Sequence, residues 1–240
     1  MLYLLPNLLA DLEHHEAYLP ASVDAAVATL SDLIAENEKE GRRFLRRFHY
    51  VAPKTFRDIK IHLLNEHSTF ADKQALIASM GKGGAWGLVS DCGMPCLADP
   101  GADLVLMARN KGISVSTFAG PSSLLMALVL SGLGGQRFTF HGYLPKEEPA
   151  LIAELKKIEK VSQKEGSTHL WIETPYRNVR LFQCMLFALQ ESSWVCLACA
   201  LTEHGQFVET KQVKEWKRAP EPFIGKRPCI FVLNAASHQI

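Results

Sequence analysis

Hydrophobic residues recur along the first half of the chain with two alternating spacings. Short apolar runs, each ended by proline, glycine or polar residues, predict buried strands at residues 2–5, 85–89 and 113–118. Longer segments with apolar positions three or four residues apart predict helices at residues 37–48, 70–83, 103–112 and 121–133. Residues 21–36 form another largely apolar segment, and the helix at 121–133 is rich in small and apolar residues, which indicates burial. The alternation predicts a mostly parallel sheet covered by helices.

The character of the chain changes after about residue 145. A charged helix is expected at residues 149–166 and a second helix near 178–190. Strands are expected at residues 168–175, 194–202 and 228–234, with a further segment at 206–216 between the last two. The connections between these strands differ in kind, which favours a mixed sheet. We therefore expect two α/β domains, residues 1–118 and 119–240, with a ligand cleft between them.

Composition and charge narrow the class of protein. The 240 residues carry 26 Lys and Arg against 25 Asp and Glu, so a net charge of +1 provides no global attraction to nucleic acid or to anionic membranes. No apolar run is long enough to span a bilayer, and the first residues lack the features of a secretory signal. These features predict a cytoplasmic protein with no membrane partner.

Cysteine and histidine residues give little sign of a metal site. In a protein without an export signal, the six cysteines are expected to be reduced thiols. Cys196 and Cys199 lie in one predicted strand at an odd separation, so their side chains are expected on opposite faces. His14, His15 and Glu16 are adjacent residues without a further ligand cluster, so we expect no metal.

Four loops follow predicted strands and carry unusual residues. They are Pro6-Asn7, residues 90–101, residues 119–123 and residues 173–178. In open α/β sheets ligands bind beyond the carboxyl ends of the strands, and glycine in such loops lets a ligand approach the backbone. Ser122 and Ser123 either cap the helix that follows or present their hydroxyl and amide groups to a ligand.

The central segments resemble the successive motifs of a known family. "LVSDCGMPCLADPGADLV", "AGPSSLLMALVLSGL", "RFTFHGYLPK" and "WIETPYRN" are similar to motifs of the tetrapyrrole methylase superfamily of S-adenosylmethionine-dependent methyltransferases. Within it, the pattern is most similar to the ribosomal RNA small-subunit methyltransferase I enzymes, which methylate the 2′-oxygen of a ribose. The resemblance runs in order from Leu2 to Leu233.

The resemblance implies a two-domain enzyme that binds S-adenosylmethionine between its domains and forms a homodimer. It also implies a set of cofactor-binding residues from both domains: Leu9, Gly93, Met94, Pro95, Leu97, Ser122, Ser123, Ile172, Ala200, Leu201 and Cys229.

The substrate-side motifs depart from the family pattern more than the cofactor-side motifs. The first loop reads "LPNLLADLEHH", where the ribosomal RNA enzymes have a Gly-Asn pair. The acidic motif after the second strand keeps Glu36 but has Asn37 in place of Asp. The histidine-acid-histidine segment is reduced to Asn65-Glu66-His67. Methyl transfer is therefore the stronger part of the prediction and the ribose acceptor the weaker part.

Four residues are candidates for the chemistry. A ribose hydroxyl needs a base or a cation that stabilises the alkoxide. Glu173, at the end of a predicted strand, is the first candidate base, although it could instead pair with Arg177 or cap a helix. Arg177 could hold a phosphate or stabilise an oxyanion. Glu36 and, with less support, His67 are further candidates.

A basic segment has two interpretations. Arg42, Arg46, Arg43 and Arg47 form two i,i+4 pairs, which with Lys39 could make a ridge that contacts RNA phosphates. The other interpretation is a solvated helix face balanced by the glutamates at positions 36, 38 and 40.

Two alternatives to an RNA methyltransferase remain open at the level of sequence. The acceptor could be a carbon of a tetrapyrrole, which needs less help from a base. The rewritten first loop is also compatible with a non-catalytic binding protein that has kept the methyltransferase fold. A nicotinamide-dependent dehydrogenase is disfavoured, because no G-x-G-x-x-G follows the first strand.

Overall fold

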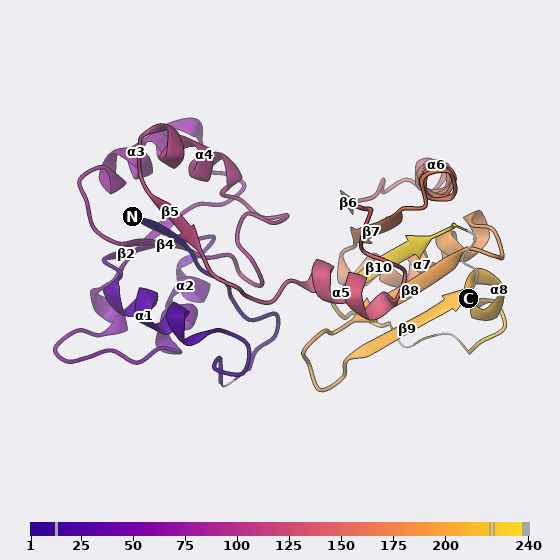
Figure 1. The fold of residues 1–240 in the computed structure, drawn as a ribbon, viewed down its shortest axis with the longest axis horizontal. Helices are drawn as coiled ribbons and strands as arrows, with labels where there is room; N and C mark the ends of the chain where they lie inside the picture. The colour runs from indigo at the N-terminus through magenta and orange to yellow at the C-terminus, as the bar shows by residue number, and fades with distance from the viewer. Residues whose placement is uncertain (13, 221, 223, 237–240) are drawn as a thin grey trace. The chain divides into compact units, whose positions relative to one another are not determined.

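The computed structural model describes every residue except 13, 221, 223 and 237–240. The chain divides into two compact units, unit 1 (Met1–Ser122) and unit 2 (Ser123–Ile240), which are described separately (Figure 1). Each unit contains a five-stranded sheet with helices packed on it. The α/β class expected from the sequence is therefore confirmed for both halves of the chain. Within the described residues, no helix is both long and apolar enough to cross a membrane.

Unit 1 is a parallel α/β sheet with the strand order β3-β2-β4-β1-β5. Its elements in chain order are β1 (Leu2–Leu4), α1 (Ala21–Thr29), β2 (Asp32–Ala35), α2 (Glu38–Arg46), the 3₁₀ helix η1 (Phe56–Asp58), β3 (Lys60–Leu63), α3 (Phe70–Met80), β4 (Trp86–Leu88), α4 (Ala102–Asn110) and β5 (Val115–Thr117).

The two faces of this sheet have separate cores because successive strand residues point to opposite sides. Leu33 of β2 packs with α1 and α2 in a cluster that also contains Leu5 and Phe44. Ile34, the next residue along β2, packs with α3 and α4 in a second cluster, which also contains Leu2. The sheet is thus buried on both faces, as parallel sheets usually are.

The apolar segment at residues 21–36 is two elements, and the hydrophobic pattern alone does not predict the second. Helix α1 ends at Thr29, and β2 begins at Asp32 after a short turn. Strand β3 is not predicted either, because "KIHL" is only four residues long. Strand β3 pairs with β2, and β2 pairs in addition with β4, which lies far along the chain.

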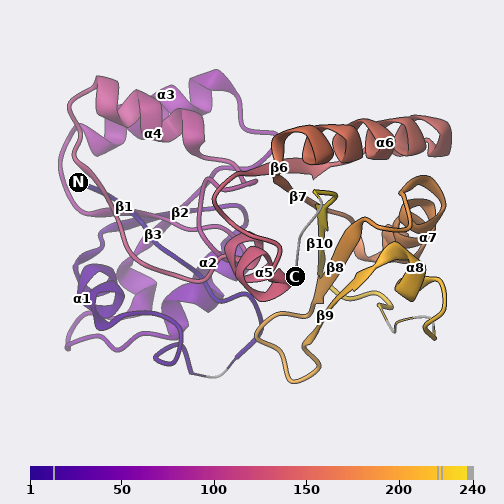
Figure 2. The same cartoon turned by 45° about the vertical axis from the view of Figure 1, so that its right-hand side comes forward.

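Unit 2 is a mixed sheet with the strand order β6-β7-β10-β8-β9, in which only β6 and β7 are parallel. Its elements are α5 (Ser123–Ser131), β6 (Phe138–Tyr143), α6 (Glu148–Glu165), β7 (Thr168–Ile172), the 3₁₀ helix η2 (Pro175–Arg177), α7 (Asn178–Ala188), β8 (Trp194–Cys199), β9 (Phe207–Gln212), α8 (Val213–Trp216) and β10 (Cys229–Asn234). Figure 2 shows α6 running along one side of the sheet, above α7 and α8.

Helix α5 is less buried than its sequence predicts. Leu124, Ala127 and Leu128 are buried, but Leu125 is 51%, Val129 78% and Leu130 46% exposed. The expected burial therefore holds for one face of the helix and fails for the other. One face of α5 packs on the sheet, and the other presents large apolar side chains.

The prediction of six reduced thiols is also wrong. Cys199 and Cys229 are bonded as a disulfide, and they lie directly opposite each other on β8 and β10. The opposite orientations of Cys196 and Cys199 are confirmed, because Cys199 packs in the core with Val195 and Leu197 while Cys196 does not. The hydrophobic pattern of β8 does not indicate that Cys199 pairs with a cysteine thirty residues later in the chain.

Candidate cofactor and acceptor site

Asn7 joins the first loop of unit 1 to the loop after β4. Its amide Nδ2 donates to the carbonyl oxygens of Ser90 at 2.9 Å and Asp91 at 2.8 Å. Its backbone forms an isolated antiparallel bridge with Gly93, and its N–H donates to the Gly93 carbonyl at 2.8 Å. Both loops follow parallel strands, so this junction lies at the carboxyl edge of the sheet, where ligands bind in such folds.

Arg47, directly after α2, completes the environment of Asn7. Its Nη1 donates to Asn7 Oδ1 at 2.8 Å, and the same oxygen accepts from the Leu8 N–H at 2.9 Å. Burial lowers the pKa of Arg47 from its ordinary value, with a further lowering from Arg43. All hydrogen-bonding groups of the buried Asn7 side chain are thus satisfied, which fixes its orientation.

Gly93 is buried at this junction. Its φ is +70°, a conformation that favours glycine, and an added Cβ would lie 3.2 Å from Leu9 Cδ2. Gly120, in the loop after β5, approaches the first loop so closely that a Cβ would lie 2.1 Å from Pro6 Cβ and 3.2 Å from Met94 Sδ. The structure therefore brings Leu9, Gly93 and Met94 together.

The other predicted cofactor residues of unit 1 lie in the same loops but differ in exposure. Pro95 and Ser122 are buried, whereas Leu97 is 42% exposed. Ser123, the next residue in the chain, begins α5 and belongs to unit 2.

Three carboxylates lie beside this junction and perturb one another. Glu36 Oε1 accepts from the Asp91 N–H at 3.1 Å, and burial raises the Glu36 pKa, with a smaller contribution from the Asp91 charge. Burial, followed by the charge of Glu36, raises the pKa of Asp99 to about 6. Burial likewise raises the pKa of Asp91. A carboxylate with a raised pKa is a stronger base near neutral pH, which suits the role considered for Glu36.

Unit 2 brings four predicted cofactor residues to one end of its sheet. Strand β10 is antiparallel to β7 and β8, so its first residue lies beside their last residues. Ile172 pairs with Ile230, Cys229 is bonded to Cys199, and the Ala200 N–H donates to the Pro228 carbonyl at 2.9 Å. Leu201 follows and is buried.

Glu173 and Arg177 form an ion pair directly after β7. Glu173 is buried, and its Oε2 accepts from Arg177 Nη2. Its Oε1 accepts from the Thr174 N–H at 2.6 Å and from Thr174 Oγ1 at 3.1 Å. The ion pair considered from the sequence is therefore present, and it holds the guanidinium at the end of the strand.

Two polar groups near this end were not predicted from the sequence. Asn178 is fully buried and donates to the Arg227 carbonyl at 2.7 Å, while its Oδ1 has no partner among the described residues. Thr202 Oγ1 is likewise buried without a partner among them, at a residue with φ of +70°. An unsatisfied buried acceptor calls for a donor, so this region suits a polar ligand. Asn178 had no sequence signal, because an asparagine at a helix start looks like a cap.

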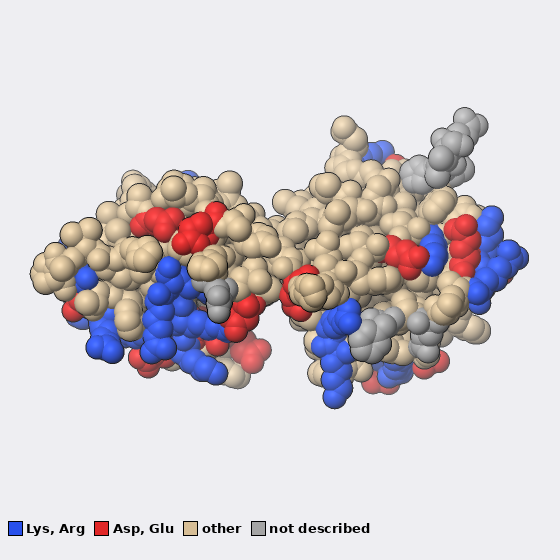
Figure 3. Space-filling view, turned by 90° about the horizontal axis from the view of Figure 1, so that it is seen from below, with Lys and Arg blue, Asp and Glu red and all other residues tan. Residues whose placement is uncertain are grey.

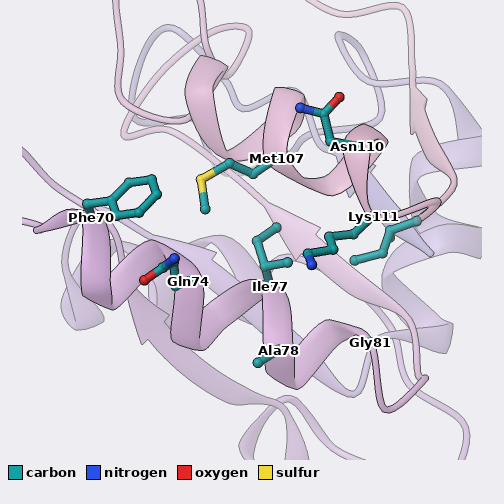
Figure 4. Close-up of a pocket in the computed structure, with 9 residues that line it drawn as sticks. Phe70, Gln74, Ile77, Ala78, Gly81, Met107, Asn110 and Lys111 are labelled. Atoms are coloured by element: carbon teal, nitrogen blue, oxygen red, sulfur yellow. The ribbon is translucent and has the colours of Figure 1, made fainter.

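Other sequence candidates lie apart from these two groups. His67 is exposed and contacts Glu66, and buried His15 pairs with Asp24 at 2.8 Å. Leaving aside the few residues whose placement is not described, no three His, Cys, Asp or Glu side chains are grouped as a metal site requires. An apolar groove between α3 and α4 is lined by Phe70, Ile77 and Met107 and contains none of the predicted site residues (Figure 4).

Comparison with known proteins finds sequence relatives of the chain. No protein-family model matches it. It is 31% identical over 189 residues to ribosomal RNA small subunit methyltransferase I of Vibrio cholerae, covering 79% of this chain and 62% of that protein. It is 33% identical over 195 residues to the protein of the same name from Rickettsia prowazekii, covering 79% and 65%. The chain thus spans less than two thirds of the length of these relatives.

Solved structures with a similar fold are methyltransferases. The methyltransferase CobJ aligns with a TM-score of 0.61 at 16% identity, covering all of this chain and 96% of its own. Uroporphyrin-III-C-methyltransferase of Thermus thermophilus aligns with a TM-score of 0.54 at 16% identity, covering 98% and 94%. At these identities the likeness concerns the fold. By sequence the chain is similar to ribosomal RNA small subunit methyltransferase I, and it has the fold of the tetrapyrrole methyltransferases.

Proposed function

We propose that this protein is an S-adenosylmethionine-dependent methyltransferase that methylates a ribose 2′-oxygen of ribosomal RNA. The observation that carries the proposal is the Asn7–Gly93 junction, where three loops meet around a glycine backbone at the carboxyl edge of a parallel sheet. The names of the sequence relatives support ribosomal RNA as the acceptor, and the sequence similarity to them supports methyl transfer as the reaction.

The residues present suit the cofactor. Gly93 leaves room for a ligand against the backbone, Leu9 and Met94 supply apolar contacts, and Ser122 adds a hydroxyl in the neighbouring loop. In unit 2, Ile172, Ala200, Leu201 and Cys229 offer an apolar wall, and Asn178 has a buried oxygen to accept a hydrogen bond. When bound, the cofactor supplies an electrophilic methyl group on a sulfonium.

The acceptor needs orientation and a route for its proton. Transfer of a methyl group is an in-line displacement, so holding the acceptor oxygen in line supplies most of the acceleration, on the order of 7–11 kcal/mol. We assign Glu173 or Glu36 to accept the hydroxyl proton and Arg177 to bind an acceptor phosphate or the developing oxyanion. Thr174 and Arg177 already hold the Glu173 carboxylate, so it needs no rearrangement before reaction.

The partners follow from the acceptor. A ribosomal RNA substrate places the protein in the cytoplasm, with the small ribosomal subunit or its RNA as partner. A homodimer would cover the exposed apolar side chains of α5. We therefore expect a dimer in sedimentation equilibrium, and a monomer at working concentration would remove this part of the proposal.

A tetrapyrrole is the second candidate acceptor. The observation that favours it is the alignment of the whole chain with CobJ and with the uroporphyrin-III enzyme. The rewritten first loop favours a third possibility, a protein that binds the cofactor without transferring its methyl group.

Calorimetric titration with S-adenosylmethionine and S-adenosylhomocysteine, with NAD as the control, tests the cofactor first. Micromolar binding of the first two and none of the third supports the proposal. Incubation with labelled cofactor and either small ribosomal subunits or a porphyrinogen then decides the acceptor. Label in RNA supports the main proposal, label in the tetrapyrrole replaces it, and binding without any labelled product favours the non-catalytic protein.

A further inference from the structure

The arginines of α2 have different environments, although their spacing predicts one ridge. Arg42 Nη1 donates to the carbonyls of Phe56 at 3.1 Å and Ile59 at 2.8 Å, which attaches α2 to the η1 turn. Arg43 pairs with Asp11 and Glu40, and Arg47 holds Asn7. Three of the four guanidiniums are therefore occupied within the protein, and Arg46 is the exception.

Arg46 shares an aromatic ring with a second exposed arginine. The guanidinium carbon of Arg46 lies 5.4 Å from the centroid of the Phe56 ring, and that of Arg57 lies 5.5 Å from it. Both arginines are exposed, while Phe56 is half-buried. Stacking restricts the side-chain rotamers of both arginines before any partner binds, so less conformational entropy is lost on binding.

Two lysines lie near this pair of arginines. Lys60 is exposed at the start of β3, and Lys54 donates to the carbonyls of Ala28 and Leu30. Among the residues that the structure describes, no carboxylate lies within ion-pair distance of Arg46, Arg57 or Lys60. Figure 3 shows Lys and Arg gathered on the side of unit 1 that carries α1 and α2.

The nearby carboxylates are already engaged. Asp58 accepts from the Thr55 N–H at 2.7 Å and from Thr55 Oγ1 at 3.0 Å, and these bonds lower its pKa. Asp32 accepts from His62 at 2.8 Å. Both carboxylates are already hydrogen-bonded within the protein. The side chains of Arg46, Arg57 and Lys60 therefore remain available to an anionic partner.

We propose that Arg46, Arg57 and Lys60, ordered around Phe56, form a docking surface for RNA phosphates. This inference rests on the proposed function, in which the acceptor is ribosomal RNA. Lys60 begins its strand, so this docking surface lies at the amino end of β3, away from the carboxyl-edge loops that carry Gly93 and Glu36. The docking surface therefore contributes to RNA affinity, and the methyl transfer takes place at the carboxyl-edge loops.

The chemistry of the three groups favours phosphodiesters over other anions. Planar guanidiniums bind phosphate oxygens through two parallel N–H donors, and an ordered pair of them suits successive phosphates of one strand. Three cations in a protein of net charge +1 are too few for stable attachment to an anionic membrane. The docking surface is expected to bind RNA without reading its sequence.

The test measures binding of the full-length protein to purified small ribosomal subunits and to a single-stranded RNA oligonucleotide, in a series of salt concentrations. The variant is Arg46→Gln with Arg57→Gln and Lys60→Gln, which keeps polar side chains of similar reach. The matched control, Arg109→Gln with Lys111→Gln and Lys82→Gln, removes three exposed charges on α4 or just after α3 and α4, which cover the other face of the sheet. A second variant with lysine at positions 46 and 57 keeps the charge and loses the planar group.

We expect the glutamine variant to bind RNA about tenfold more weakly at 0.15 M salt, with the slope of log affinity against log salt reduced by about 2. The control should match the wild type, and the lysine variant should keep the slope. Equal affinity and slope in the glutamine variant and the wild type would overturn the inference, as would wild-type binding that does not depend on salt. If the glutamine variant does not fold, the lysine variant provides the test. A reduced slope of log affinity against log salt in the lysine variant would count against the inference. S-adenosylmethionine affinity, measured on the same proteins, should not change, so failure of this docking surface is separable from failure of the methyltransferase assignment.

Discussion

Arg47 and Asn7 are forty positions apart in the chain and joined by a hydrogen bond of 2.8 Å between Nη1 and Oδ1. Asn7 in turn donates to the carbonyls of Ser90 and Asp91. One asparagine therefore couples the end of α2, the loop after β1 and the loop after β4. The opening of the candidate cofactor site depends on this coupling.

Replacing Asn7 tests that dependence. Asn7→Ala removes the partner of the buried Ser90 carbonyl, of the partly buried Asp91 carbonyl and of the Arg47 guanidinium, so we expect a loss of about 2–3 kcal/mol in the free energy of unfolding. Cofactor affinity should fall as well, because the loop that carries Gly93 loses its anchor. Urea denaturation and calorimetry measure the two effects. Arg42→Ala serves as the comparison, because it removes an α2 arginine that is bonded to η1. Unchanged cofactor affinity in Asn7→Ala would show that the junction does not shape the site.

Gly93 offers a test with a close internal control. Gly93 and Gly112 both have a φ of +70°, but a Cβ on Gly112 would meet nothing within 4 Å. Alanine at either position therefore carries the same backbone strain, on the order of 1 kcal/mol. Only Gly93→Ala should weaken S-adenosylmethionine binding, because only there would the added methyl group press on Leu9, which is assigned to the cofactor site. Equal affinities of the two variants would mean that the cofactor lies elsewhere.

Glu173 is tested by removing its charge. If it accepts the proton of the acceptor hydroxyl, Glu173→Gln should lower the methylation rate at saturating acceptor by about 100-fold or more. Glu148→Gln is the control, because Glu148 forms an exposed pair with Arg180 in the same unit. A rate unchanged by Glu173→Gln would leave Glu36 as the candidate base. If the Arg177 guanidinium binds an acceptor phosphate, Arg177→Lys should weaken acceptor affinity more than it lowers the methylation rate at saturating acceptor.

Asp99 makes stability depend on pH. Burial beside Glu36 raises its folded-state pKa to about 6, above its value of 3.8 in an unfolded chain. The folded protein therefore holds this proton more tightly than the unfolded chain, so this contribution to stability is present at low pH and is lost as the pH rises from about 4 through about 6. Because Asp99 is partly exposed, Asp99→Asn should raise the free energy of unfolding by only about 1 kcal/mol at pH 7.5 and should not change it at pH 4. Urea denaturation of both proteins at the two pH values checks the difference, and an equal difference at both pH values would refute the ionisation argument.

Local pattern predicted much of the fold and part of the site. The apolar runs at β1 and β4 and the glycine-closed helices α3 and α4 follow from periodicity and from the conformational freedom of glycine, which act over a few residues. The loops after the strands were predicted by their glycine and proline content. The similarity of these loops to one family indicated the cofactor-side residues. All of these signals lie within short stretches of chain.

Contacts between distant segments decided the rest. Strands β2 and β3 are stabilised by pairing with each other, and β2 also pairs with β4; neither strand has a strong pattern of its own. The bond between Cys199 and Cys229 depends on the register of two antiparallel strands. The four arginines of "GRRFLRRF" are equivalent in sequence, yet three of them bond to neighbours within the protein, and Arg46 stacks on Phe56. The sequence determines which charged and hydrogen-bonding side chains are present. Only the fold determines which of them are bonded to other residues of the protein.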